Sequence, residues 1–321
     1  MERGVKLLLL GGPKFLGRAL IEAALARGHE VTTFNRGQTN PDVYPQVEKL
    51  HGDRDGGLHA LRGGSWDAVL DTSGYVPRIV GASAELLASS AERYAFVSTI
   101  AVYRDFLEQP AEDYPMAELE EETEEYQGPA YGPLKALCEQ ALREVFDYRA
   151  LIVRPGLIVG PHDPTDRFTY WPRRVERGGP VLAPAPPEQP VQMIDVRDLA
   201  EWIVRMVEER QSGVFNATSP PGAITFASML KASGATEVVW VDEDFLLERE
   251  VAPWRDLPCW MGSRDPQMRH LQLVDVSRAV DAGLTFRPLA ETAGEVPEWT
   301  GQPGLSPKRE AELLEAWKAA V

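Results

Sequence analysis

The sequence predicts an α/β protein built on a doubly wound parallel sheet, with a smaller C-terminal α/β domain that binds substrate. Three observations predict this fold. Short aliphatic runs alternate with stretches long enough for crossover helices, and a glycine-rich turn joins the first run to the first helix. Residues 161–190 then interrupt the alternation with a segment rich in proline and arginine. Continuous apolar strands that alternate with helices are typical of a parallel sheet covered on both faces.

The first strand–helix–strand unit is the clearest part of this pattern. Residues 5–10 form a continuous aliphatic strand, and residues 15–27 carry leucine and isoleucine at helical spacing. Gly28 ends that helix, and residues 30–34 form the second strand. A change from continuous to helical spacing within one short stretch indicates a βαβ unit.

The remaining elements follow in the same alternation. We expect further strands over 47–51, 66–71, 95–99, 150–153, 191–195 and 214–217, and helices over 79–90, 131–148 and 196–209. The last hundred residues contain only short elements, over 238–241 and 245–250, before a terminal helix over 308–320.

Charge and composition limit the function. Of the 321 residues, 33 are Lys or Arg and 49 are Asp or Glu, which gives a formal net charge of −16. Such a field repels polyanions, so we expect neither nucleic acid nor an anionic membrane as a partner. Two cysteines and five scattered histidines predict no metal site. We therefore expect a cytoplasmic protein, monomeric or homodimeric, that acts on a small molecule.

The turn after the first strand predicts a dinucleotide site. It reads Gly11-Gly12-Pro13-Lys14-Phe15-Leu16-Gly17 and opens a helix. A glycine turn at a helix N-terminus offers free amides and a partial positive charge to a pyrophosphate, as in Rossmann folds. A plain strand–helix turn is the alternative. The residues expected to bind cofactor here are Gly11, Pro13, Lys14, Phe15, Leu16 and Gly17, and Lys14 replaces the middle glycine of the usual pattern.

This site sets the expected domain boundaries. Residues 1–160, joined by 191–217, are predicted to form the dinucleotide-binding domain. Residues 161–190 and 218–321 are predicted to form the substrate-binding domain.

The end of the second strand indicates which nicotinamide cofactor binds. An acid there would accept hydrogen bonds from the adenosine ribose, but this strand ends in Asn35 and Arg36. Arg36 is suited to a 2′-phosphate, through a charge-assisted contact of roughly 1.5–3 kcal/mol. A solvated turn arginine is the alternative. The sequence thus favours NADP, with NAD possible.

A catalytic pair is predicted at the start of the helix over 131–148. Tyr131 and Lys135 are four residues apart, so they share one helix face. We expect the ammonium group to lower the pKa of the phenol, which could then exchange a proton with a substrate oxygen during hydride transfer. Ser98 and Thr99 end the fifth strand, at the sheet edge where ligands bind.

Together these motifs resemble the extended short-chain dehydrogenase/reductases, the NAD-dependent epimerase/dehydratase family, over essentially the whole chain. The turn resembles that of an atypical branch with Lys or Arg at the middle glycine. The matching positions are the glycine turn, Asp53-Arg54, Asp71-Thr72-Ser73, Thr99, Tyr131, Lys135, Arg154-Pro155-Gly156 and Asp195-Val196-Arg197-Asp198.

The resemblance implies a role for each matching residue. Tyr131 would be the acid/base, Lys135 would hold the nicotinamide ribose, and Thr99 would hydrogen-bond the reacting oxygen. Asp53 would approach the adenine. The other residues that the resemblance places at the cofactor are Arg54, Thr72, Ser73 and Pro155.

Departures from the family pattern bear on the substrate. Acids that dehydratases carry after the threonine are replaced by Ile100 and Ala101, which argues against elimination. The asparagine of nucleotide-sugar epimerases is replaced by Leu157, and residues 191–193 lack their arginine. Both losses argue against a nucleotide-sugar substrate.

Two charged segments have opposite implications. The stretch over 111–126 holds eight acids and no base, and we expect it to be a solvated loop or to border the active site and disfavour a dianionic substrate. Four arginines interleaved with aromatics, Arg167, Arg173, Arg174 and Arg177, form either an anion-binding wall or, as we favour, a helix that packs its aromatics and solvates its arginines.

The leading hypothesis is an NAD(P)-dependent oxidoreductase that transfers hydride to or from a small, weakly charged carbonyl or alcohol. One alternative is a sugar or nucleotide-sugar epimerase with tightly bound dinucleotide. The other is a non-catalytic dinucleotide- or RNA-binding scaffold.

Overall fold

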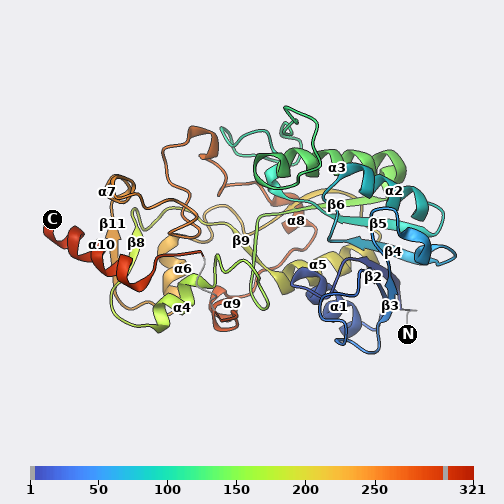
Figure 1. The fold of residues 1–321 in the computed structure, drawn as a ribbon, viewed down its shortest axis with the longest axis horizontal. Helices are drawn as coiled ribbons and strands as arrows, with labels where there is room; N and C mark the ends of the chain where they lie inside the picture. The colour runs from blue at the N-terminus through green and yellow to red at the C-terminus, as the bar shows by residue number, and fades with distance from the viewer. Residues whose placement is uncertain (1–3, 299–302) are drawn as a thin grey trace.

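A seven-stranded parallel sheet forms the centre of the protein in the computed structural model, which describes residues 4–298 and 303–321 (Figure 1). The strand order is β10-β6-β5-β4-β1-β2-β3. The strands are β1 (Lys6–Leu10), β2 (Glu30–Asn35), β3 (Glu48–His51), β4 (Trp66–Asp71), β5 (Ala91–Val97), β6 (Ala150–Pro155) and β10 (Gly213–Ala217). The predicted doubly wound α/β fold is confirmed, and the order reverses between β1 and β4, where such sheets bind ligands.

Helices cover both faces of this sheet. Helices α1 (Leu16–Ala26) and α5 (Val196–Glu208) pack together on one face, and α2 (Pro77–Leu87) and α3 (Tyr131–Phe146) on the other (Figure 1). The aliphatic run of β1 supplies both cores, because Leu7 and Leu9 join the α1/α5 side while Leu8 and Leu10 join the α2/α3 side. Strand side chains alternate between faces, which is why a doubly covered strand is apolar throughout.

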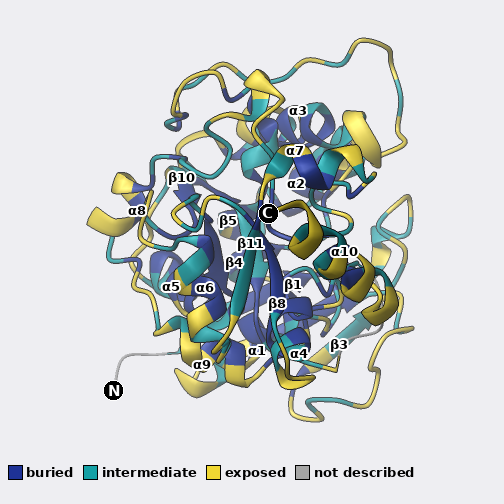
Figure 2. Cartoon of the chain, turned by 90° about the vertical axis from the view of Figure 1, so that its left-hand side faces the viewer, coloured by how far each residue is buried: buried dark blue, intermediate teal, exposed yellow. Residues whose placement is uncertain are grey.

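A second body extends from the carboxyl end of the sheet and has its own core. Its strands are β8 (Val181–Pro184) and β11 (Val238–Val241), which pair in parallel, and its helices are α4 (Tyr170–Glu176), α6 (Phe226–Ala232), α7 (Glu243–Glu248), α9 (Leu289–Gly294) and α10 (Pro307–Ala320). Trp171, Phe226 and Trp260 lie at the centre of this core. Figure 2 shows α10 with a broad exposed face. We propose domain boundaries on the basis of these separate cores.

Helix α8 (Ser277–Asp281) differs from the expected division. Ala279 belongs to the core under α5 rather than to the second core, and Leu284 packs beside it. The chain therefore returns to the sheet domain a second time, after residue 218.

Several element boundaries differ from the sequence prediction. The fifth strand ends at Val97, so Ser98 and Thr99 follow it. The strand expected over 191–195 is β9 (Met193–Asp195), which pairs with β7 (Leu157–Val159) outside the large sheet. The piece expected over 245–250 belongs to a helix, because Phe245 and Leu246 turn one face of α7 inward.

The helical interpretation of the arginine- and aromatic-rich segment is correct for its aromatics and wrong for one arginine. Tyr170 and Trp171 are buried in α4 as expected. Arg174 is also buried, because Glu310 of α10 accepts hydrogen bonds from it at 2.5 and 2.7 Å.

A membrane-spanning helix is absent from the part of the chain that the structure describes. Within the same residues, no three His, Cys, Asp or Glu side chains are grouped as metal ligands.

A buried ion pair joins α3 to the sheet. Arg154 of β6 and Glu139 of α3 meet at 2.6 Å, and both side chains are at most 2% exposed. Arg154 also donates to the hydroxyl of Tyr103 and to the carbonyl of Glu112. Because its guanidinium is held by the protein itself, Arg154 fixes the helix that carries Tyr131.

Replacing Glu139 should therefore destabilise the fold. Glu139→Ala leaves the Arg154 charge buried without a carboxylate, which costs about 3–5 kcal/mol of unfolding free energy. Urea denaturation followed by circular dichroism measures this loss. Glu144→Ala, an exposed position on the same helix, should stay within about 0.5 kcal/mol of the native protein. Equal stabilities for the two variants would contradict the prediction.

Candidate functional site

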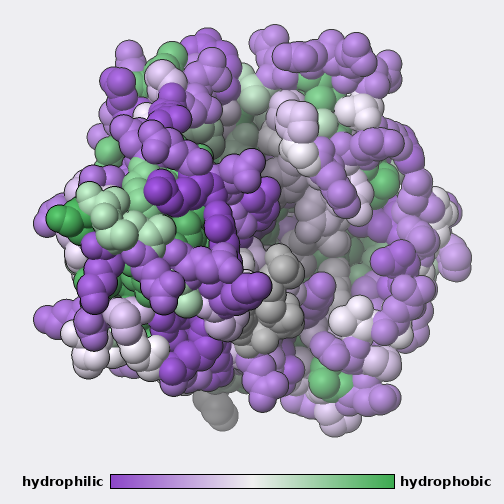
Figure 3. All heavy atoms as spheres, turned by 60° about the vertical axis from the view of Figure 1, so that its left-hand side comes forward, coloured by the Kyte–Doolittle hydropathy of each residue, from purple (hydrophilic) through white to green (hydrophobic). Residues whose placement is uncertain are grey.

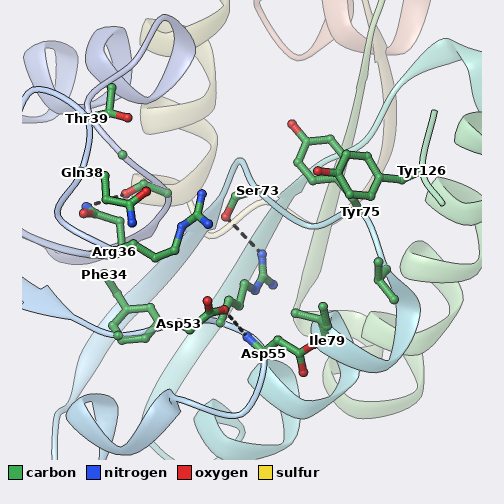
Figure 4. Close-up of a pocket in the computed structure, with 16 residues that line it drawn as sticks. Phe34, Arg36, Gln38, Thr39, Asp53, Asp55, Ser73, Tyr75, Ile79 and Tyr126 are labelled. Carbon is green, nitrogen blue, oxygen red and sulfur yellow. Dashed lines mark hydrogen bonds between the residues drawn. The ribbon is translucent and has the colours of Figure 1, made fainter. Parts of the chain in front are cut away.

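Two adjoining cavities lie at the carboxyl ends of β1, β2, β4 and β5. One has a volume of about 350 Å³ and the other about 380 Å³. They share the residues Gly11, Gly12, Ser73 and Tyr75. The cavities therefore form one groove that crosses the glycine turn, and Figure 4 shows the first of them.

The glycine turn gives this groove the features of a phosphate site. Gly11 has a φ of +145°, and a Cβ there would lie 2.4 Å from Oγ1 of Thr72. A Cβ on Gly17 would lie 2.2 Å from the Gly12 carbonyl. Phe15 precedes α1 with a strained φ of 43°, and no side chain caps the helix. The first amides of α1 thus face the groove, as a pyrophosphate requires.

Two cations lie beside these amides without an acidic partner. Lys14 lines the second cavity and Arg36 the first, and both are exposed. Neither side chain forms a hydrogen bond or ion pair with residues 4–298 or 303–321. Figure 4 shows Arg36 extending from the end of β2 into the cavity, on the side of Ser73.

The first cavity also has the walls that an adenosine needs. Phe34, Val76 and Ile79 supply apolar surface, and Asp53 is exposed at the rim. One Asp53 carboxylate oxygen accepts the amide of Asp55 at 2.9 Å. The residues present fit a nicotinamide dinucleotide lying across the turn.

Three residues that the sequence places at the cofactor, Asn35, Pro13 and Arg54, have side chains that support the groove or lie beside it. Asn35 donates to the carbonyl of Gly11 at 3.1 Å and accepts the amide of Gly37 at 2.7 Å, so its side chain locks the turn to β2. Pro13 lines neither cavity of the groove and lies in a small neighbouring one. The third, Arg54, lies beneath the first cavity.

Arg54 forms a buried ion pair with Asp71. Its two terminal nitrogens donate to the carboxylate at 2.6 and 2.5 Å, and the Asp71 side chain is fully buried. The remaining donor bonds Ser83, and further contacts reach Ser73 and Tyr94. The guanidinium is therefore committed to the protein, and we regard Arg54 as the floor of the cavity.

The second cavity brings together the predicted catalytic residues. It is lined by Thr99, Tyr131 and Lys135, along with Thr72 and Pro155. The Thr99 hydroxyl lies close enough to Tyr131 to lower the pKa of its phenol, and it accepts the amide of Ala101 at 3.1 Å. The three residues that the sequence predicts as catalytic therefore line one cavity, and their catalytic roles stay predictions.

Close packing of helix α3 against the segment after β5 brings Tyr131 near Thr99. Helix α3 lies against residues 100–102, and a Cβ on Gly132 would be 2.0 Å from the Ala101 carbonyl. Only glycine allows this approach, which brings Tyr131 to the end of β5. Gly132 was visible in the sequence, but nothing local marked it as a contact.

The predicted effect of Lys135 on Tyr131 is wrong in direction. Burial raises the pKa of Tyr131, and the hydroxyl of Thr99 and the charge of Arg167 only partly oppose it. The Lys135 ammonium is instead bonded to the carbonyls of Gly74 and Val97, both at 2.7 Å. Tyr131 is thus protonated at neutral pH in this structure.

Burial also changes Lys135 itself. The side chain is only 3% exposed, and its ammonium lies 4.0 Å from the centre of the Phe96 ring. Loss of hydration lowers the pKa of Lys135 to about 8.

Two tyrosines that the sequence interpretation missed border the groove. Tyr75 lines both cavities and Tyr126 lines the first. Their rings stack with centres 4.8 Å apart (Figure 4). Tyr75 follows the predicted Thr72 and Ser73, but Tyr126 is distant in sequence and had no local signal.

The acidic stretch over 111–126 does reach the groove through this stack. Next to Tyr126, Glu124 pairs with Arg78 at 2.6 Å, and Arg78 pairs with Asp55 at 2.5 Å. Asp55 and Tyr126 both line the first cavity. At the other end of the stretch, Glu112 is buried and accepts the amide of Asn216, so it is not a solvated acid.

Comparisons with known proteins identify the family. Residues 7–218 match the model of the NAD dependent epimerase/dehydratase family. The chain belongs to this family.

One curated relative is similar over most of this chain. The chain is 26% identical to the chloroplast stem-loop binding protein of 41 kDa b of Arabidopsis thaliana over 249 residues. The match covers 71% of the chain and 62% of that relative, so the chain spans less than two thirds of its length.

Solved structures share the fold at low identity. The enzyme WbmH of Bordetella bronchiseptica, solved with NAD+, is 18% identical with a TM-score of 0.65, over 92% of this chain and 97% of that one. UDP-glucuronic acid 4-epimerase of Bacillus cereus, solved with NAD, is 14% identical with a TM-score of 0.63, over 91% and 97%. UDP-N-acetylglucosamine 4-epimerase of the same species is 16% identical with a TM-score of 0.65, over 90% and 97%.

The buried Lys135 predicts a pH dependence of stability. Its pKa is about 8 in the folded state against 10.5 ordinarily, so the unfolded chain binds more protons between these values. Stability should rise with pH in that window, by about 2 kcal/mol between pH 8 and pH 10. Urea denaturation of the native protein and of Lys135→Met measures the difference. The variant should lack this part of the rise, and parallel profiles would contradict the assignment.

Proposed function

We propose that this enzyme is an epimerase that holds its nicotinamide dinucleotide tightly and inverts one hydroxyl-bearing carbon of a sugar substrate. The observation that carries the proposal is the placement of Thr99, Tyr131 and Lys135 in the same groove as the glycine turn. The sequence favoured net oxidation or reduction. The family and the epimerases among the solved structures favour epimerisation instead.

The proposed chemistry needs little from the protein beyond positioning and one proton. When bound, the dinucleotide would take a hydride from the substrate carbon and return it to the opposite face. Thr99 and Tyr131 would hold the substrate oxygen between them. For this, Tyr131 would first lose its own proton to solvent and act as the phenolate. It would take the hydroxyl proton in the oxidation half and return it to the oxygen in the reduction half. No net proton or electron is consumed.

Retention of the dinucleotide is supported by the contacts over the first cavity. Arg78 ties Glu124 to Asp55, and Tyr126 stacks on Tyr75 beside this bridge. A bound adenosine would lie under this ion-pair bridge and the stacked tyrosines. An epimerase benefits from such retention, because the reduced cofactor must stay for the second half of each turnover.

NADP is the dinucleotide that we propose. Arg36 is unpaired at the end of β2, and the neighbouring Asn35 is committed to the backbone of Gly11 and Gly37. A 2′-phosphate would satisfy Arg36. Two of the solved structures named above contain NAD, so a preference for NADP would distinguish the present chain from them.

A nucleic-acid scaffold is the less favoured function. The curated relative is named for binding stem-loops, which agrees with the third sequence hypothesis. The net charge of −16 opposes phosphate binding, however. The face shown in Figure 3 carries both hydrophilic and hydrophobic residues and has no single broad apolar surface.

Arg36 can be tested by cofactor affinity. Arg36→Ala should weaken NADP binding by about 10–150-fold, the loss of a charge-assisted contact, and leave NAD affinity unchanged. Fluorescence titration of protein freed of bound dinucleotide measures both constants. Equal losses for the two cofactors would contradict the proposed contact.

The epimerase itself is tested by cofactor content and by Tyr131. Denaturing the purified protein should release about one dinucleotide per chain. Tyr131→Phe should retain that content but lose at least about 100-fold in substrate inversion, because proton transfer is lost. Nuclear magnetic resonance of a sugar panel follows inversion without net change in nicotinamide absorbance. Retained activity in Tyr131→Phe would exclude the proposed role.

A further inference from the structure

The structure separates Arg167 from the other arginines of its segment. The others are held by acids or carbonyls within the second body: Arg173 by Glu176 and Val296, Arg174 by Glu310, and Arg177 by Glu310. The side chain of Arg167 forms no ion pair or hydrogen bond with the described residues. It is a half-buried cation whose charge is not neutralised.

Arg167 lies beside the catalytic cavity. Its guanidinium rests over the ring of Trp254, 5.1 Å from the centre. Pro164, three residues earlier on the same loop, lines the cavity. The charge is close enough to lower the pKa of Tyr131. Stacking on an aromatic ring fixes the plane of a guanidinium and leaves its N–H groups free for a planar acid.

Polar atoms without partners surround the same space. Ser98 lines the cavity and is 4% exposed, yet its hydroxyl has no hydrogen-bond partner within residues 4–298 and 303–321. The hydroxyl of Thr218, which lies against Gly156 of the cavity wall, also has no hydrogen-bond partner among the described residues. Buried hydroxyls are normally bonded, so they indicate a polar ligand.

Among the described residues, the nearby Asp163 forms no ion pair with Arg167, although the Arg167 charge partly lowers the pKa of this acid. Asp163 is buried, and one oxygen of its carboxylate accepts both the amide and the hydroxyl of Thr165. The other oxygen has no partner, and no salt bridge joins it to Arg167. Burial raises the pKa of Asp163, which favours the neutral acid.

We propose that Arg167 binds an acidic group of the substrate, a carboxylate or a phosphate ester, close to the carbon on which Tyr131 acts. This inference rests on the proposed epimerase function and names its substrate class: an acidic sugar. It replaces the weakly charged substrate expected from the sequence. Ser98, which lines the cavity, would then hydrogen-bond a hydroxyl of the same sugar.

Calorimetric binding to the dinucleotide-loaded protein tests the proposal with three probes: glucose, glucuronate and glucose 6-phosphate. The native protein should bind at least one acidic probe about tenfold or more tightly than glucose. The two acids distinguish a carboxylate from a phosphate. Arg167→Ala should lose about 10–150-fold for that acid and nothing for glucose. Arg167→Lys should recover part of the loss, because it keeps the charge without the planar fork.

Controls separate this inference from the proposed function. Arg264→Ala removes an exposed arginine of the same body, paired with Asp244, and should bind all three probes as the native protein does. Absence of any preference for the acids in the native protein, weak binding of all probes included, overturns the anion site. An unchanged preference in Arg167→Ala does the same. A purified protein that cannot be loaded with dinucleotide instead contradicts the epimerase function, and probe binding to it still tests Arg167.

Discussion

The buried ion pair between Arg54 and Asp71 is the constraint on which the site depends. Asp71 ends β4 at the point where the sheet reverses its order, and Arg54 reaches it from the loop after β3. The pair also contacts Ser73, Tyr94 and Ser83, so it joins β4, β5 and α2 beneath the first cavity. Such a pair has a fixed geometry, because moving either partner leaves a charge without compensation in the protein interior.

Above this floor, the protein divides its arginines into two kinds. Arg54, Arg154 and Arg174 are buried against carboxylates and hold elements together. Within the residues that the structure describes, Arg36 and Arg167 are not paired. Arg36 lines the first cavity, and Arg167 follows the loop of Pro164, which lines the second. A charge left without a partner beside a cavity is available to a ligand, whereas a compensated one is not. The anions that we propose for the two arginines are a ribose 2′-phosphate and an acid of the substrate.

Local patterns were reliable where a single residue type had one physical meaning. The aliphatic strand, the glycine turn and the four-residue spacing of Tyr131 and Lys135 all predicted what the structure contains. Prediction was incomplete where a side chain had a choice of partners. Arg54 was expected at the cofactor, and it does line the first cavity, but its guanidinium is bound to Asp71. Lys135 was expected to act on Tyr131, yet two backbone carbonyls bind it.

The sequence by itself determined the doubly wound sheet, the family and the residues that meet in the groove, because strand periodicity and turn chemistry are local properties. Tertiary structure alone decided which charged side chains form ion pairs within the fold. Glu310 lies 136 residues from Arg174 along the chain, and Tyr126 lies 51 from Tyr75. Only folding brings such pairs within contact, so only the folded chain shows that Arg167 has no ion pair within residues 4–298 and 303–321.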